Sequence, residues 1–179
     1  MIKFYNTIVR KKVDFTTLID DKVSLYTCGP TVYDFAHIGN FRAYIFEDLL
    51  RRTLEFCDYE VLHVMNITDI DDKTINKANN ESVPLKEFTD KYIKAFHEDV
   101  NRLNIIPAHH YPRATEFIDG MINMIQSLEK KGYTYTTEDG SVFFKISQYK
   151  DYGKLANIQL EDLVLGERVE NDEYEKEEM

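Results

Sequence analysis

The fold of this chain is indicated most directly by residues 27–40, which read TCGPTVYDFAHIGN. This run lies between a strand-like stretch, VSLY at 23–26, and a helical pattern that begins near Phe41. Glycine and small polar residues therefore occur where a strand leads into a helix, and free N–H groups at the positive end of a helix bind anions. Because a thiol, an imidazole and two glycines share this run, we expect a nucleotide phosphate site beside a second, thiol-seeking ligand.

The segments that follow predict a βαβ unit. Apolar residues recur at helical spacing from Phe41 onward, and the run EVLHVMNI at 60–67 is typical of a buried strand. Strand, turn, helix and strand within about 45 residues form the βαβ unit of an α/β fold with a parallel sheet. The loop TDIDD at 68–72 follows the second strand, so we expect it at the same sheet edge as the Cys28 loop. The predicted apolar helix face is Phe41, Ile45, Leu49, Leu50, Leu54 and Cys57.

Composition and charge restrict the class of protein. A chain of 179 residues with 43% hydrophobic residues suits one domain, or one domain with a modest insertion. Half of the net charge of −10 lies at 167–179, and no basic stripe marks a dedicated nucleic-acid binder. No apolar run approaches the roughly 20 residues that cross a bilayer, and no signal peptide is evident. We expect a cytoplasmic monomer without a membrane partner, with Cys28 and Cys57 reduced and Cys57 in the core.

The sequence pattern changes near residue 115. We expect a helix at about 84–103 and another at about 115–131, the second with its apolar residues facing inward. Two strand-like runs within 133–146 flank an Asp-Gly pair and predict a hairpin. A hairpin does not continue a βαβ series, so we expect a boundary between residues 1–114 and a small α+β module at 115–179.

Together these segments resemble the cysteinyl-tRNA synthetases, which are class I aminoacyl-tRNA synthetases. A HIGN motif alone would be weak evidence, but its combination with CGPTVYD is specific, and the matches cover nearly the whole chain. The resemblance implies that 1–114 is the first half of a Rossmann-type parallel-sheet catalytic domain with a HIGH-type motif. It also implies that 115–179 begins the connective insertion. The matching motifs are CGPTVYD at 28–34, HIGN at 37–40, NITDIDDK at 66–73, PRATE at 112–116, DYGKL at 151–155 and GERVE at 166–170.

The resemblance implies an ATP site formed by four residues. His37 and Asn40 would be the catalytic side chains on the phosphates of ATP, which binds with Mg²⁺. Pro30 and Gly39 would complete the site, Gly39 by leaving room for the adenine. Asn40 stands where histidine is the common class I residue, and it can donate a hydrogen bond but cannot carry a charge.

The resemblance further implies that Gly29, Thr31 and Thr68 line a cysteine pocket and that Cys28 is the first zinc ligand. Zinc favours a thiolate over a hydroxyl and so separates cysteine from serine. The family's other zinc ligands, its KMSKS loop and its anticodon-binding region have no counterpart here. We therefore expect the amino-terminal part of a cysteine–tRNA ligase that is inactive alone and binds zinc weakly or not at all. In the intact enzyme the partners would be ATP, L-cysteine and tRNA(Cys), in protein biosynthesis.

Other interpretations remain open at this stage. A related ligase activates cysteine in the same way and joins it to an amino-sugar inositol. A non-catalytic nucleotide-binding remnant, or a free-standing nucleotidyltransferase, would also contain a HIGH-type motif. His37 alone could be a helix cap or a core histidine. The carboxylates Asp69, Asp71 and Asp72 fit caps of the following helix better than a metal site.

Overall fold

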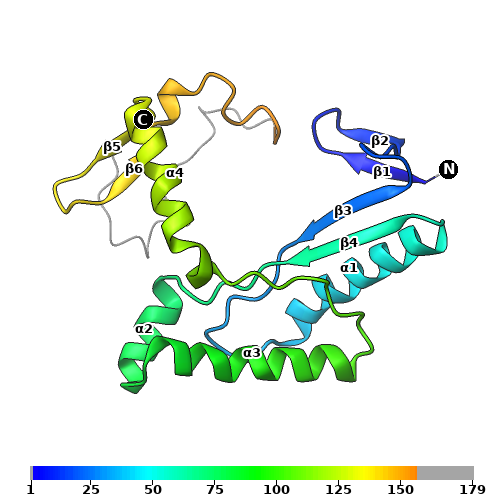
Figure 1. Cartoon of the computed structure of the whole chain (residues 1–179), viewed down its shortest axis with the longest axis horizontal. Helices are drawn as coiled ribbons and strands as arrows, with labels where there is room; N and C mark the ends of the chain where they lie inside the picture. The colour runs from blue at the N-terminus through cyan, green and yellow to red at the C-terminus, as the bar shows by residue number, and fades with distance from the viewer. Residues whose placement is uncertain (1, 157–179) are drawn as a thin grey trace. The chain divides into compact units, whose positions relative to one another are not determined.

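The computed structural model describes residues 2–156. The chain divides into two compact units, of which one is residues 17–119 and the other combines 2–16 with 120–156. The unit at 17–119 is a mixed α/β structure that contains all the predicted site residues (Figure 1). Its elements are β3 (Lys22–Thr27), α1 (Ile38–Phe56), β4 (Glu60–Met65), α2 (Asp72–Glu81) and α3 (Leu85–Arg102).

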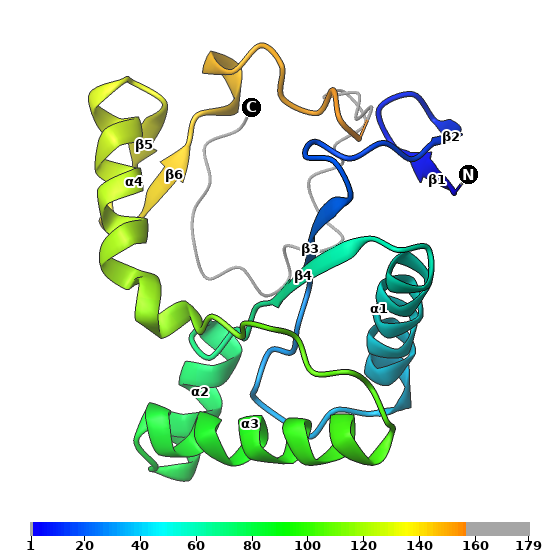
Figure 2. The same ribbon diagram turned by 45° about the vertical axis from the view of Figure 1, so that its right-hand side comes forward.

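Strand β4 lies at the centre of the sheet in this unit. It pairs in parallel with β3, with Thr27 opposite Met65. On its other side the segment after α3 runs parallel to it: the N–H of Met65 donates to the carbonyl of His110 at 3.0 Å, and that of Ile67 to the carbonyl of Pro112 at 2.8 Å. Helix α1 packs along β4 (Figure 2). The predicted βαβ unit is therefore confirmed as part of a Rossmann-type α/β domain.

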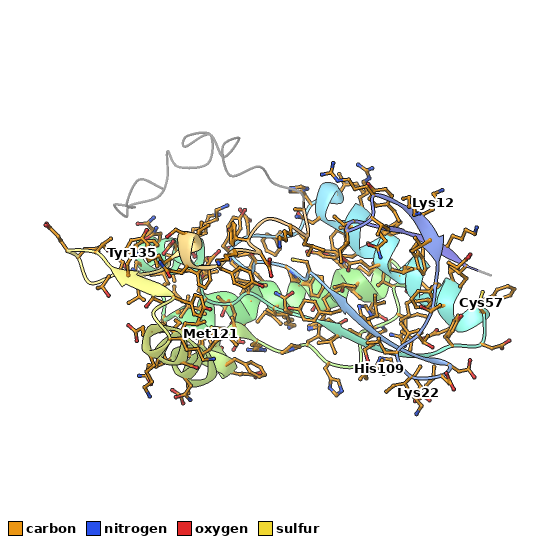
Figure 3. All side chains as sticks on the ribbon, turned by 90° about the horizontal axis from the view of Figure 1, so that it is seen from above. Lys12, Lys22, Cys57, His109, Met121 and Tyr135 are labelled. Atoms are coloured by element: carbon orange, nitrogen blue, oxygen red, sulfur yellow. The ribbon has the colours of Figure 1, made fainter. Side chains whose placement is uncertain are left out.

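The buried face of α1 differs from the predicted one. Ile45 and Leu49 are exposed, and so is Cys57, which is the C-cap residue of the helix (Figure 3). The prediction that Cys57 belongs to the core is wrong, because the helix has ended at this residue. The apolar pattern also overstated the width of the buried face, since only the stripe toward the sheet and α3 is covered. The buried residues of α1 are Phe41, Tyr44, Arg51 and Leu54.

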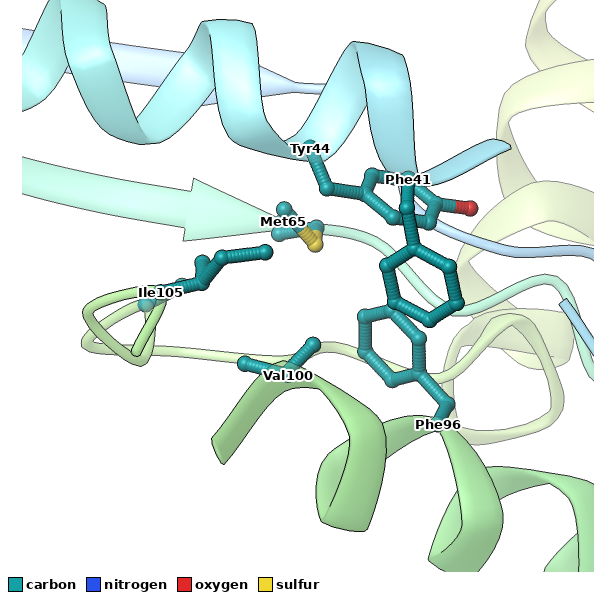
Figure 4. Packing of buried hydrophobic residues seen from close by; sticks show 7 residues of the cluster. Phe41, Tyr44, Met65, Phe96, Val100 and Ile105 are labelled. Carbon is teal, nitrogen blue, oxygen red and sulfur yellow. The ribbon is translucent and has the colours of Figure 1, made fainter. Parts of the chain in front are cut away.

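Two apolar clusters hold this unit together. In the first, Phe41, Tyr44 and Phe96 form edge-to-face ring pairs with centroids 5.6 Å and 5.3 Å apart, beside Met65 (Figure 4). This cluster joins α1 and β4 to α3. The second cluster joins the loops that follow β3 and β4 to α2 and α3, so it anchors the region of the predicted site. Its members are Val32, Ile67, Ala78, Phe88, Tyr92 and Ile93.

Helix α3 confirms the prediction of a helix at 84–103. Pro84 is its N-cap residue, where the missing N–H costs no helical hydrogen bond. Phe88, Tyr92, Phe96 and Val100 are buried at helical spacing. The inward face of α3 therefore contributes to both apolar clusters, and it ties them into one core.

The other unit contains two small hairpins and one helix. Strands β1 (Lys3–Asn6) and β2 (Lys11–Asp14) pair antiparallel, as do β5 (Thr134–Thr136) and β6 (Val142–Phe144). The second pair is the predicted hairpin, and Gly140 of its Asp-Gly turn has a φ of 87°. The first pair was not predicted.

Helix α4 (Ile118–Lys130) follows a short 3-10 helix at Ala114–Phe117. It is the helix predicted at 115–131, but none of its residues is buried. The expectation that Met121, Ile122 and Ile125 face inward is therefore wrong, since the described residues provide no layer that covers them.

The compact units divide at residues 119 and 120, so the predicted domain boundary after residue 114 stays a prediction. A second 3-10 helix lies at Ile146–Gln148. The acidic end of the chain and the motif at 166–170 lie outside the described residues.

The packing of the first cluster predicts how much a core substitution lowers the free energy of unfolding. Phe96→Ala should lower the free energy of unfolding by about 3–5 kcal/mol, because it leaves a cavity between α1 and α3. Ile45→Ala, on the exposed side of α1, should cost less than about 1 kcal/mol. Urea denaturation followed by circular dichroism measures both. Equal losses in the two variants would contradict this description of the core.

Candidate functional site

The candidate site is built by two loops that continue beside each other after β3 and β4 end. The N–H of Val32 donates to the carbonyl of Thr68 at 3.1 Å, and the N–H of Thr68 donates to the carbonyl of Pro30 at 3.0 Å. These bonds extend the parallel pairing into the loops. The side chain of Asn66 accepts from the N–H of Gly29 at 3.2 Å. The CGPT run and the NIT run are therefore held together by their backbones.

Gly29 is required by this close approach. A Cβ atom at this position would lie 1.8 Å from the carbonyl oxygen of Asn66 and 2.8 Å from the side chain of Met65. A real Cβ never approaches backbone that closely, so any other residue would force the two loops apart. The packing of the two loops therefore requires glycine at position 29, whether or not a ligand is bound.

A cavity of about 350 Å³ opens beside the paired loops. Five of the predicted site residues line it, namely Gly29, Pro30, Thr31, His37 and Asn40. Its size is within the range of small-molecule sites. The predicted residues outside the lining are Cys28, Gly39 and Thr68.

The three predicted residues outside the lining adjoin those that line the cavity. Thr68 is paired with Pro30 and Val32 through its backbone. The N–H of Gly39 donates to the ring of His37. The Cys28 thiol is exposed, next to Gly29, and donates to the carbonyl of Gly29 at 3.8 Å. The sulfur is therefore free of the apolar core.

His37 and Asn40 form a reciprocal cap at the start of α1. Nδ1 of His37 accepts from the N–H of Gly39 at 3.0 Å, and Oδ1 of Asn40 accepts from the N–H of His37 at 3.0 Å. Because Nδ1 is the acceptor, the neutral ring carries its proton on Nε2. The cap thus uses the acceptor atom of each side chain and leaves an N–H donor on each.

The electrostatics of this helix end favour an anion. The first turn of α1 contains no acidic residue. The helix dipole and two spare side-chain donors therefore meet at the cavity without a local negative charge from the helix itself. The helix-cap role of His37, considered above as an alternative to function, is present and is compatible with phosphate binding.

The acidic loop after β4 serves two separate structural purposes. Asp71 is the N-cap of α2, since its Oδ1 accepts from the N–H of Thr74 at 2.8 Å. Asp69 does not cap this helix: its carboxylate accepts from the N–H and the hydroxyl of Thr115 at 2.9 and 2.7 Å. The expectation of a helix cap is therefore right for Asp71 and wrong for Asp69. Asp69 instead ties the site loop to the start of the next segment.

No group of three histidine, cysteine or acidic side chains among residues 2–156 is arranged to hold a metal ion. A protein zinc site takes three or four side-chain ligands, and Cys28 supplies one. The described residues do not fit a complete zinc site, so the role of Cys28 as a zinc ligand stays a prediction.

A buried polar cluster that the sequence did not indicate lies behind the cavity. The hydroxyl of Thr27, one residue before Cys28, is 2.9 Å from Nε2 of His63, and the Glu47 carboxyl lies close to Thr27. Burial raises the pKa of the Glu47 carboxyl, although the nearby Thr27 hydroxyl opposes this. Burial, with Arg51 nearby, lowers the pKa of His63. These residues lie on two strands and a helix, so no local sequence pattern could reveal the cluster.

Tyr44 connects this cluster to the cavity, which it helps to line. Burial, with smaller contributions from Glu47 and Cys28, raises the pKa of Tyr44 to about 12. The phenol therefore stays protonated at neutral pH.

The chain belongs to the family of class I tRNA synthetase catalytic domains: residues 14–179 match the family described as tRNA synthetases class I (C) catalytic domain. Its curated relatives include proteins named cysteine–tRNA ligase. That of Chlamydia caviae is 53% identical over 173 residues, which are 97% of this chain and 36% of the relative.

Similar relatives occur in distant organisms. The cysteine–tRNA ligase of Brachyspira hyodysenteriae is 52% identical over 178 residues, and that of Thermococcus kodakarensis is 50% identical over 175 residues. Each match covers 98% of this chain and 37% of the relative. The chain thus spans little more than a third of the length of these proteins. None of the helices at residues 2–156 is long and apolar enough to cross a membrane.

The approach at Gly29 predicts a contrast between two glycine substitutions. Gly29→Ala should separate the paired loops and lower the free energy of unfolding by more than about 2 kcal/mol, because the added Cβ meets backbone rather than a flexible side chain. Gly120→Ala, in α4 with nothing within 4 Å, should gain up to about 1 kcal/mol. Urea denaturation measures both, and a stable Gly29→Ala protein would contradict the close approach.

Proposed function

We propose that this chain is the amino-terminal part of a cysteine–tRNA ligase and that its cavity binds ATP and L-cysteine. The observation that carries the proposal is the cap at the start of α1, which leaves the Nε2–H of His37 and the amide of Asn40 available at a cavity bounded by the CGPT loop. The proposal is also supported by identities of 50–53% to proteins named cysteine–tRNA ligase.

The proposed reaction is the formation of cysteinyl-adenylate. An oxygen of the cysteine carboxylate attacks the α-phosphorus of ATP, and the bond to pyrophosphate breaks. Catalysis of this kind depends on positioning and on stabilisation of the charge on the phosphate oxygens. His37, Asn40 and the N-terminus of α1 would supply that stabilisation, with Pro30 and Gly39 beside the nucleotide. The adenylate would then esterify the terminal ribose of tRNA(Cys).

The cysteine moiety would lie against Gly29, Thr31 and Thr68, whose loops are paired. Cys28, adjacent to this pocket, would contribute one thiolate to a zinc ion in the longer protein, where zinc would bind the substrate thiol. We expect this chain alone to bind zinc weakly and to be inactive. Selection of cysteine over serine should therefore require the longer protein, whereas recognition of an aminoacyl group should not.

Three measurements test the proposal. By calorimetry, the chain should bind the cysteinyl-sulfamoyl analogue of cysteinyl-adenylate at least about tenfold more tightly than adenosine, because the analogue also occupies the aminoacyl pocket. Cysteine-dependent exchange of pyrophosphate into ATP should be absent from this chain and present in a protein of the length of its relatives. The longer protein should transfer the activated cysteine to tRNA(Cys) and not to an amino-sugar inositol. This result distinguishes a cysteine–tRNA ligase from the related ligase that uses the inositol.

Equal affinity for the analogue and for adenosine would contradict the proposal and favour a non-catalytic nucleotide-binding remnant. Exchange of pyrophosphate into ATP without any amino acid would favour a free-standing nucleotidyltransferase.

A further inference from the structure

The cavity contains one ammonium group, that of Lys73. This residue lies in the first turn of α2 and lines the cavity together with His37 and Asn40. Its Nζ lies 5.4 Å from the centre of the Tyr33 ring. No salt bridge of the described residues involves Lys73, so its charge has no counter-charge within ion-pair distance among residues 2–156.

Lys77, one helical turn further along α2, provides an internal comparison. Its Nζ also lies over the Tyr33 ring, at 4.9 Å, but it forms a salt bridge with Asp34 at 2.8 Å. This bond raises the pKa of Lys77 and lowers that of Asp34. Lys77 is not among the residues that line the cavity. The two lysines therefore share a helix and an aromatic neighbour but differ in charge compensation and in access to the cavity.

The two carboxylates at the cavity are already engaged. Asp34 accepts from Lys77 and from the N–H of Phe35 at 2.8 Å. Asp71 accepts from the N–H of Thr74 as the N-cap of α2. Neither carboxylate forms an ion pair with Lys73, so the charge of Lys73 is available to a ligand.

The position of Lys73 is unfavourable for α2 itself. A cation in the first turn of a helix opposes the helix dipole, and Asp72 in the same turn only partly offsets this. An anion in the cavity would reverse this effect, because it would interact favourably with both the ammonium group and the helix end. The local conflict is therefore relieved by a bound anion.

We propose that Lys73 binds the phosphate groups of the nucleotide and is a further catalytic residue of this site. This inference rests on the proposed function. It adds a positively charged donor from α2 to the neutral donors of His37 and Asn40. The triphosphate of ATP is an anion that can accept charge-assisted hydrogen bonds from Lys73. Phosphates of an RNA strand have the same chemistry, but a cavity lined by the HIGN and CGPT runs fits a single nucleotide.

Calorimetry on three proteins tests the proposal: the unmodified chain, Lys73→Gln and the matched control Lys77→Gln. Each is titrated with three ligands, which are Mg-ATP, the cysteinyl-sulfamoyl adenosine analogue and a CCA-ended oligonucleotide. Lys73→Gln should weaken ATP binding at least about tenfold, the size of one lost charge-assisted contact. The analogue has no β- and γ-phosphates, so its affinity should change less than about twofold. Lys77→Gln leaves Asp34 without its partner beside the cavity, so it should weaken ATP binding slightly, but much less than Lys73→Gln does. Circular dichroism checks that each variant is folded.

The outcomes separate this inference from the proposed function. Unchanged ATP binding by Lys73→Gln, or equal losses for ATP and the analogue, would overturn the role of Lys73. So would a loss confined to a CCA-ended oligonucleotide, which would place RNA phosphate at this lysine. A selective loss of ATP binding, with no preference of the unmodified chain for the analogue over adenosine, would support Lys73 and overturn the proposed function. Absence of any ATP binding by the unmodified chain would overturn both.

Discussion

The pairing of the two loops beyond β3 and β4 is the constraint on which the site depends. Two backbone hydrogen bonds, from Val32 to Thr68 and from Thr68 to Pro30, continue the parallel ladder after both strands have ended. They require Gly29, because a Cβ there would meet the backbone of Asn66. A ligand beside the CGPT loop therefore also lies beside the second loop, and the start of α1 follows a few residues later.

The two loops that form the site are anchored in the apolar core. Val32 and Ile67, one in each loop, are 1% exposed and pack against α2 and α3. Fixing these side chains fixes the backbone groups around the cavity without using any polar side chain of the site. His37 and Asn40 are held separately, by the hydrogen bonds of the cap at the start of α1. Each side chain retains an N–H donor for a phosphate oxygen. Lys73 adds the one ammonium group in the lining.

Sequence reasoning succeeded where the determinants were local. The βαβ unit, α3, the hairpin of β5 and β6 and the N-cap at Asp71 all follow from short-range spacing, glycine and capping preferences. It failed where the partner or the burial of a residue depends on contacts with residues far away in the sequence. Asp69 bonds to Thr115, 46 residues away, rather than to the adjacent helix. Cys57 fits the apolar period of α1 but lies where the helix ends. The different roles of Lys73 and Lys77 depend on Asp34, which is 43 residues from Lys77.

Amide hydrogen exchange followed by NMR tests the loop pairing most directly. The amides of Val32 and Thr68 should exchange at least about 100-fold more slowly than in an unfolded chain and should resemble that of Met65 in β4. The amide of Phe35, bonded only to the exposed side chain of Asp34, should exchange rapidly. Rapid exchange at Val32 and Thr68, with Met65 still protected, would mean that the loops are not paired and would contradict the account of the site.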